Sequence, residues 1–190
     1  MNNRILSVDV FRGFTIALMI IVNSPGNWSN TFSPLLHADW NGITLTDFVY
    51  PFFIFIVGVS IVLSKNNKGT TSSKKSIILR SIKIFILGVF LGGFTESMYH
   101  FMSTGGLPSI SDTRIPGVLQ RIAIVYLTCA IMYDYTNWIQ QLIIMLSILI
   151  LYYVCMQFIP VPGIGTGVLE PGKNLAAYID SILILSLIHI

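Results

Sequence analysis

Charged side chains are scarce in this sequence. Asp, Glu, Lys and Arg make up 10 % of its 190 residues, against about 25 % in an average soluble protein. Apolar residues, counted with Tyr, Trp and Cys, make up 54 %, and the mean hydropathy is +0.77. A soluble domain of this size cannot bury so much apolar surface, and a disordered chain would not contain it. The composition therefore predicts a polytopic membrane protein.

Cysteine is scarce too. The two cysteines, Cys129 and Cys155, stand inside apolar runs, which argues against a secreted disulfide scaffold. The net charge of +3 does not indicate a nucleic-acid partner, because four of the eleven Lys and Arg residues stand in one short loop. These four are Lys65, Lys68, Lys74 and Lys75. Such a cluster is typical of a cytoplasmic loop between two membrane spans.

Long apolar runs predict an all-α fold, a polytopic transmembrane helix bundle surrounded by membrane lipid. A helix needs about 20 mostly apolar residues to cross about 30 Å of hydrocarbon. Five full spans and a truncated sixth are expected, at residues 5–23, 45–63, 77–98, 115–133, 138–159 and 175–190. In the third run, Gly88 and Gly92 form a G-x-x-x-G step that favours close helix packing.

The lysine-rich loop sets the expected orientation, since cytoplasmic loops are enriched in Lys and Arg. It places the N-terminus in the cytoplasm. The loops at residues 24–44, 100–114 and 160–174 then face the outer side.

Two charges stand near the cytoplasmic end of the first span. Asp9 and Arg12 are three residues apart, so they share one helix face. Ionisable groups at membrane depth are costly and usually functional. One interpretation is a self-neutralising pair that fixes helix packing. The other is a contact with the phosphates of a cofactor at the inner mouth of the bundle.

A second polar cluster lies between the first two spans. His37, Trp40, Asn41 and Asp47 stand close together at the outer membrane edge. A histidine in such surroundings indicates acid–base chemistry, because histidine titrates near neutral pH. Metal binding is a poor alternative, since no second His or Cys stands at ligand spacing. Thr44, three residues before Asp47, matches a capping box that opens the second span.

A third cluster is the stretch Arg114-Ile-Pro-Gly-Val-Leu-Gln-Arg121. Its two arginines share one helix face, and Arg121 would lie about 10 Å deeper than Arg114. A guanidinium at this depth needs a carboxylate, such as Asp47, or an anionic ligand. Gln120 adds a second polar group, and a structural ion pair is the simpler interpretation. Asn23 ends the first span, and helix termination explains it as well as catalysis does.

Three stretches, in this order, resemble the heparan-alpha-glucosaminide N-acetyltransferase family, including its bacterial transmembrane glucosamine N-acetyltransferase-like members. The first is Ser7-Val-Asp-Val-Phe-Arg-Gly13, and the last is the Arg114 to Arg121 stretch. Between them stands His37-Ala-Asp-Trp-Asn-Gly-Ile-Thr-Leu-Thr-Asp47. The resemblance runs over about residues 7–180.

The resemblance implies that residues 1–190 are a single transmembrane acyltransferase-like domain, the N-terminal half of a longer chain. It implies a multi-pass enzyme of the bacterial inner (plasma) membrane. This transferase would move an acetyl group from cytoplasmic acetyl-CoA to the amine of a glucosamine-type sugar on the outer side. The last residues, 185–190, resemble the translation of sequencing-adapter DNA, so the natural protein is expected to be longer.

The same resemblance suggests roles for the polar clusters. It matches His37 to the active-site histidine of the family, and the expected catalytic residues are His37, Asp47, Asn23 and Asn41. Residues expected to hold acetyl-CoA are Arg12, Asp9, Arg121 and Gln120. Those expected to bind the amino sugar or glycan acceptor are Trp40 and Arg114. No metal is expected. A homodimer is expected.

Two questions stay open at this level. His37 can serve as the base for the amine, or it can carry the acetyl group as an acyl-imidazole. The function also has alternatives, namely O-acetylation of a cell-envelope glycan, or a proton-coupled transporter or permease. In the transporter, His37, Asp47 and Arg121 would form a proton or anion path.

Overall fold

The computed structural model describes residues 5–68, 74–104 and 117–183, and these residues are helical with connecting loops. Arg114 and residues 185–190 lie outside this described part. Strands are absent from it, apart from one isolated bridge between Val161 and Gly165, so the all-α expectation is confirmed. The chain forms two compact units, Met1–Lys74 and Lys75–Ile190, and each is described by itself. The expectation of one domain stays a prediction.

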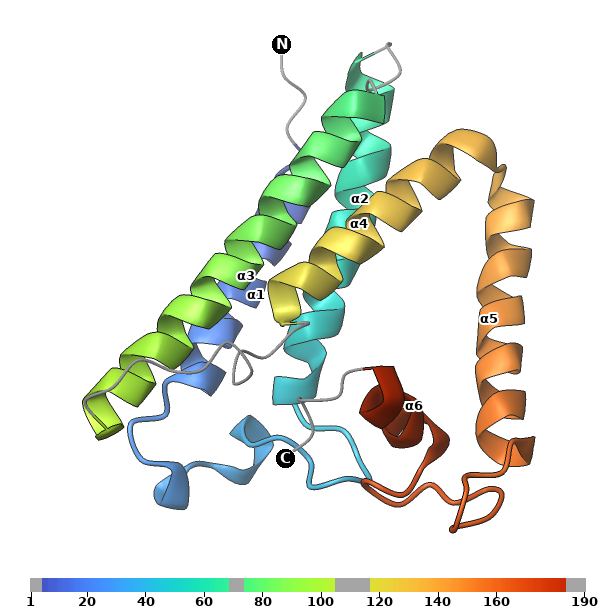
Figure 1. The fold of residues 1–190 in the computed structure, drawn as a ribbon. Coiled ribbons are helices and arrows are strands. Elements are labelled where there is room, and N and C mark those ends of the chain that lie inside the picture. Colours follow the sequence, from blue (N-terminus) through green and yellow to red (C-terminus); the bar gives the residue numbers. More distant parts are fainter. Residues whose placement is uncertain (1–4, 69–73, 105–116, 184–190) are drawn as a thin grey trace. The chain divides into compact units, whose positions relative to one another are not determined.

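The first unit is built on two helices that lie side by side (Figure 1), α1 (Leu6–Asn23) and α2 (Val49–Lys68). The ring of Phe11 packs edge-on against Phe52 and Phe55, with centroids 5.1 and 6.0 Å away. Such aromatic pairs add stability beyond the area that they bury. The buried core of this unit is formed by Leu18, Val22 and Val49. These contacts fix α2 against α1 along much of their length.

The loop between α1 and α2 contains three 3-10 turns, η1 (Trp28–Asn30), η2 (Ser33–Leu35) and η3 (Thr46–Phe48). The last turn runs into α2 without a break. Between η2 and η3 the chain reverses at Gly42, whose φ of 121° suits a residue without a side chain. This reversal brings the two ends of the segment 37–47 together.

In the second unit, α3 (Lys74–Thr104) packs against α4 (Val118–Tyr135). The buried Ser81 hydroxyl of α3 donates a hydrogen bond to the backbone oxygen of Ala123 in α4, at 2.8 Å. Gly88 marks a close approach, because a Cβ at this position would lie 2.8 Å from Leu119 Cβ. Hence the two helix backbones come near each other at Gly88.

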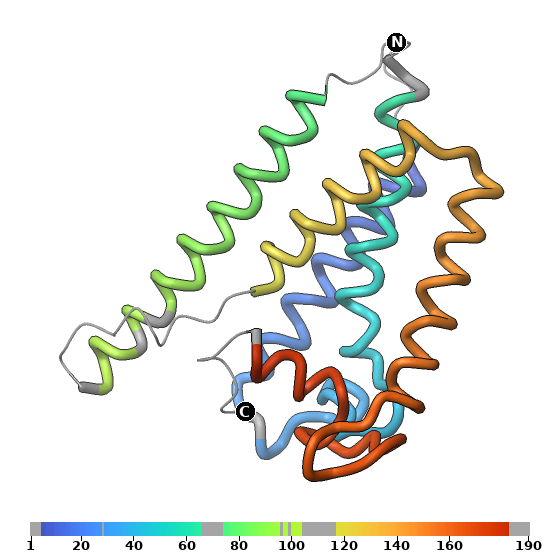
Figure 2. Tube along the Cα trace, turned by 45° about the vertical axis from the view of Figure 1, so that its right-hand side comes forward, coloured from blue at the N-terminus to red at the C-terminus, as the bar shows by residue number. Residues whose placement is uncertain are grey.

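The rest of this unit is α5 (Trp138–Phe158) and α6 (Leu175–Leu183), which contact each other. Figure 2 shows the loop that joins them. A capping box of Asn137 and Gln140 starts α5, a helix with no buried residue. In the joining loop Lys173 binds Glu170 at 2.9 Å, and this contact holds the pKa of the Glu170 carboxyl below its ordinary value.

Four described helical segments are long and apolar enough to cross a membrane, and they are Leu6–Asn23, Thr46–Lys65, Lys74–Ser103 and Trp138–Phe158. They correspond to four of the five expected full spans. The remaining one forms α4, whose polar Gln120, Arg121 and Asp134 lower its hydropathy. The number of spans stays a prediction.

Candidate active site

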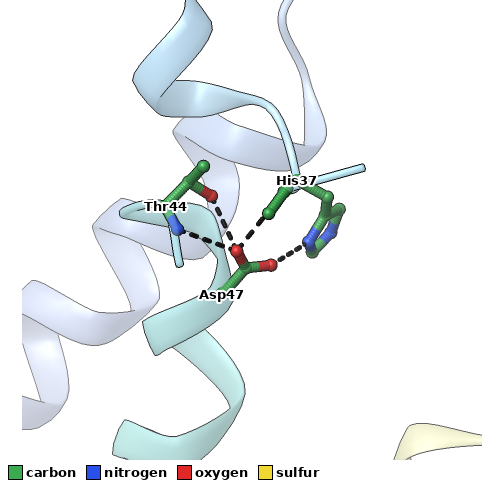
Figure 3. Close-up of polar contacts among 4 residues, drawn as sticks. His37, Thr44 and Asp47 are labelled. Atoms are coloured by element: carbon green, nitrogen blue, oxygen red, sulfur yellow. Dashed lines mark hydrogen bonds and ion pairs between the residues drawn. The ribbon is translucent and has the colours of Figure 1, made fainter. Parts of the chain in front are cut away.

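The carboxylate of Asp47 is the centre of the polar cluster in the loop before α2 (Figure 3). Its Oδ1 lies 2.6 Å from His37 Nδ1. Its Oδ2 accepts hydrogen bonds from the backbone N–H and the hydroxyl of Thr44, both at 2.9 Å. The backbone N–H of Ala38 adds a longer bond of 3.4 Å. The expected neighbourhood of His37 and Asp47 is therefore a direct contact.

Local chain geometry explains this contact. The backbone N–H of Asp47 donates to the Thr44 carbonyl at 3.2 Å, which closes the turn that leads into η3. The Asp47 carboxylate then folds back on the Thr44 N–H, as in a capping box. The Thr44 hydroxyl is engaged differently from a capping residue, because it donates to the carboxylate. The Thr44 hydroxyl thus gives a second hydrogen bond to Asp47 in place of the expected bond to a backbone N–H.

The hydrogen bonds assign the proton on the imidazole. An ionised carboxylate can only accept hydrogen bonds, so Nδ1 must carry the proton that faces Oδ1. In a neutral ring Nε2 then keeps its lone pair. The His37 side chain is 72 % exposed, whereas that of Asp47 is 29 % exposed. A group of this kind can accept a proton from an incoming molecule or attack an electrophilic carbon.

The other residues expected at the outer mouth lie on the same unit. Asn23 is the last residue of α1, and its amide donates to the Met19 carbonyl at 2.9 Å. This bond supports the helix-termination interpretation of Asn23. Asn41 and Trp40 are exposed in the loop. Their expected roles stay predictions.

The expected charge pair near the other end of α1 is confirmed. Arg12 Nη1 lies 3.5 Å from Asp9 Oδ1, and both side chains are about half exposed. Arg12 Nη2 also donates to the Ser60 hydroxyl of α2, at 3.2 Å. Ser60 could not be predicted from the sequence, because a lone serine in an apolar span carries no signal. The guanidinium therefore links α1 to α2 and still has N–H groups to offer an anion.

A cavity of about 230 Å³ opens between α1 and α2 in the same region. Its lining is Ser7, Val8, Phe11, Phe55, Ile56 and Val59. The wall is apolar apart from the serine, and Arg12 belongs to the same stretch of α1. A ligand with a thin apolar arm and an anionic head would match this combination.

Gln120 and Arg121 belong to the second unit, in the first turn of α4. Gln120 is 2 % exposed, and a Cβ on Gly88 or Gly117 would lie 3.0 or 2.7 Å from its Oε1. It therefore fills the close contact between α3 and α4. Arg121 is exposed. Their expected contacts with acetyl-CoA, and the expected pairing of Arg121 with Asp47, stay predictions.

Comparison with known proteins identifies the family of the chain. A family profile described as "Heparan-alpha-glucosaminide N-acetyltransferase, catalytic" matches residues 4–173. The chain belongs to this family. Two relatives named heparan-alpha-glucosaminide N-acetyltransferase, from Mus musculus and Homo sapiens, are each 30 % identical to it. The matches cover 96 % and 95 % of this chain and 32 % of each relative.

The chain thus spans about a third of the length of these heparan-alpha-glucosaminide N-acetyltransferases. The region of this chain that matches the family profile contains both the His37–Asp47 cluster and the Asp9–Arg12 pair. The resemblance inferred from the motifs is confirmed.

Proposed function

We propose that the protein is a membrane-embedded acetyltransferase that uses acetyl-CoA to acetylate the amine of a glucosamine-type sugar. The observation that supports this most is the 2.6 Å contact between His37 Nδ1 and Asp47 Oδ1, in a chain that belongs to an N-acetyltransferase family. A contact of this kind leaves an exposed Nε2 that is ready to take a proton. Amide formation needs such a base, because a free amine is mostly protonated at neutral pH.

The proposed reaction can follow two routes. In direct transfer, the amine nitrogen attacks the thioester carbon, a C–N bond forms and the C–S bond breaks. His37 Nε2 takes one N–H proton from the amine and returns it to the sulfur of CoA. In the carrier route, Nε2 attacks the thioester carbon, the C–S bond breaks and CoA leaves as the thiolate. The amine nitrogen then forms the C–N bond as the bond from the acetyl carbon to Nε2 breaks, and the amine proton is taken by the released Nε2. In both routes Asp47 stabilises the positive charge on the imidazole ring.

The two polar regions of the first unit support separate binding sites for the two substrates along α1 and α2. Arg12 is proposed to contact a phosphate of CoA on the cytoplasmic side, and the adjacent apolar cavity to take the pantetheine arm. The His37 loop is proposed to face the sugar on the outer side. Asn23 and Asn41 would donate hydrogen bonds to the oxyanion, and Trp40 and Arg114 would contact the sugar. Further proposals are an inner-membrane location and a homodimer.

The decisive experiment is an assay of the purified product of the intact gene in lipid nanodiscs. Free CoA thiol and N-acetylated sugar are measured with acetyl-CoA and glucosamine. The proposal predicts CoA release that depends on the sugar, and a loss of about 10²–10⁴-fold in His37→Ala, as is typical for a general base. His100→Ala, in the other unit, is the matched control and should keep its activity.

Other outcomes would contradict the proposal. Sugar-dependent release of CoA with an ester as product would indicate O-acetylation instead. Flux of a solute across the membrane without loss of thioester would indicate a transporter. Retention of more than about a tenth of the activity by His37→Ala, far above the 10²-fold floor for a general base, would remove His37 from the chemistry.

A further inference from the structure

The two threonines next to Asp47 have opposite environments. Thr44 is partly buried, and both its backbone N–H and its hydroxyl bind Asp47 Oδ2 at 2.9 Å. Thr46 is 5 % exposed, and its hydroxyl is buried without a hydrogen-bond partner in the described part of the chain. The Thr44 hydroxyl therefore binds the carboxylate, whereas the Thr46 hydroxyl makes no hydrogen bond within the described residues.

The orientation of the Asp47 carboxylate depends on the contacts at Oδ2. The torsion that turns a carboxylate about its own axis has broad minima, so it is not fixed by rotamer preference alone. The three donors at Oδ2, two from Thr44 and a longer one from Ala38, restrict this torsion. Oδ1 is then held toward His37 Nδ1.

His37 in turn depends on Asp47. Its side chain is 72 % exposed, so packing restrains the ring weakly. The 2.6 Å bond to Oδ1 is the contact that sets both the ring direction and the position of its proton. A carboxylate that turns freely would leave the ring free to rotate and to exchange tautomers.

We propose that Thr44 is a positioning residue of the acetyl-transfer site, whose hydroxyl keeps Asp47 aligned so that His37 presents an unprotonated Nε2. This inference rests on the proposed function. Thr44 does not touch the reacting atoms; it acts through Asp47 on His37. Its hydroxyl should therefore affect turnover and not the binding of either substrate.

The test compares Thr44→Val with Thr44→Ser and Thr46→Val. Thr44→Val removes one charge-assisted hydrogen bond, and kcat is expected to fall about tenfold while KM for acetyl-CoA and for glucosamine stays within about twofold. Thr44→Ser keeps the hydroxyl and should restore kcat to within about threefold of wild type. Thr46→Val removes a hydroxyl without a partner and should behave as wild type. Thr44→Ala serves as a second variant without the hydroxyl if the valine protein does not fold.

A spectroscopic readout separates this inference from the proposed function. Nitrogen-15 NMR of labelled histidine reports which nitrogen of a neutral imidazole ring carries the proton. Wild type, Thr44→Ser and Thr46→Val should show a protonated Nδ1. Thr44→Val should show a mixture of the two tautomers. These spectra need no acetyl transfer, so they test Thr44 even if the assigned reaction is wrong.

Two results would overturn the inference. The first is a Thr44→Val protein with wild-type kcat and a wild-type His37 spectrum. The second is equal loss in Thr44→Val and Thr44→Ser, which would assign the effect to the methyl group and its packing.

Discussion

Asp47→Asn removes the charge of the central carboxylate while it keeps the size of the side chain. From the sequence alone this looks like a mild change, since asparagine keeps a hydrogen-bonding group. The structure indicates a larger effect. The Oδ2 position receives the backbone N–H groups of Thr44 and Ala38, so the amide oxygen must occupy it. The amide NH₂ group is then directed at His37 Nδ1.

This arrangement reverses the tautomer of His37. An NH₂ group only donates, so Nδ1 becomes the acceptor and the proton moves to Nε2. A protonated Nε2 can neither take a proton from an amine nor attack a thioester. To restore the active tautomer, the amide must turn its NH₂ toward the Thr44 N–H, which then loses its acceptor.

The size of the effect follows from these contacts. An unsatisfied donor costs about 1–3 kcal/mol, and the exchange of a charged acceptor for a neutral one costs about 1 kcal/mol more. The sum of about 2–4 kcal/mol corresponds to a loss of about 30-fold to about 10³-fold in kcat. Asp39→Asn is the matched control, because Asp39 is an exposed carboxylate in the same loop. It should keep its activity.

Steady-state rates of CoA release and nitrogen-15 spectra of His37 check this prediction on the same samples. A folded Asp47→Asn protein that keeps more than a third of the wild-type kcat would refute the reasoning. So would a spectrum in which Nδ1 of His37 is still protonated, because the amide would then have turned without cost.

Three further predictions concern packing, the inner mouth and topology. Gly88→Ala forces a Cβ to within 3.0 Å of α4 side chains, and we expect it to lower the free energy of unfolding by about 1–3 kcal/mol. Among the described residues, Gly92→Ala meets no neighbouring atom within 4 Å, so thermal unfolding in detergent should show no loss of stability. Equal stability of the two variants would contradict the close approach at Gly88. Arg12→Ala should weaken acetyl-CoA binding about 10-fold to 100-fold in calorimetry, because one charge-assisted contact is lost. Wild-type affinity in this variant would mean that Arg12 serves only to link α1 to α2. Cysteine at Asn30 but not at Asn67, in a protein whose native cysteines are replaced, should react with an impermeant thiol reagent in intact cells; the reverse pattern would invert the topology.

The helices could be predicted from the sequence because membrane thickness sets their length. The expected run 138–159 corresponds to α5, which ends at Phe158, and the pairing of Asp9 with Arg12 follows from helical spacing. The end of the third helix differs from the expected one. The expected run stops at residue 98, but α3 continues to Thr104, because polar residues do not break a helix that is already formed.

Contacts between elements were harder to predict. The step of Gly88 and Gly92 was expected to pack as a pair, but a Cβ would meet neighbouring atoms only at Gly88 within the described residues. The direction of the Thr44 hydroxyl depends on the turn at Gly42, and loop geometry has no periodic signal. Ser60 could not be predicted either, because its contact with the Arg12 guanidinium depends on how α1 packs against α2.

The direct continuation of η3 into α2 ties the contact between His37 and Asp47 to the rotation of α2. Asp47 moves with α2, whereas His37 belongs to the loop. A side chain lies about 5–6 Å from its helix axis, so a rotation of α2 by about 20° displaces the carboxylate by about 2 Å and breaks its bond to Nδ1. The aromatic contacts of Phe11 with Phe52 and Phe55 resist such a rotation. The alignment of the His37 imidazole therefore depends on the packing of phenylalanine rings elsewhere on α1 and α2.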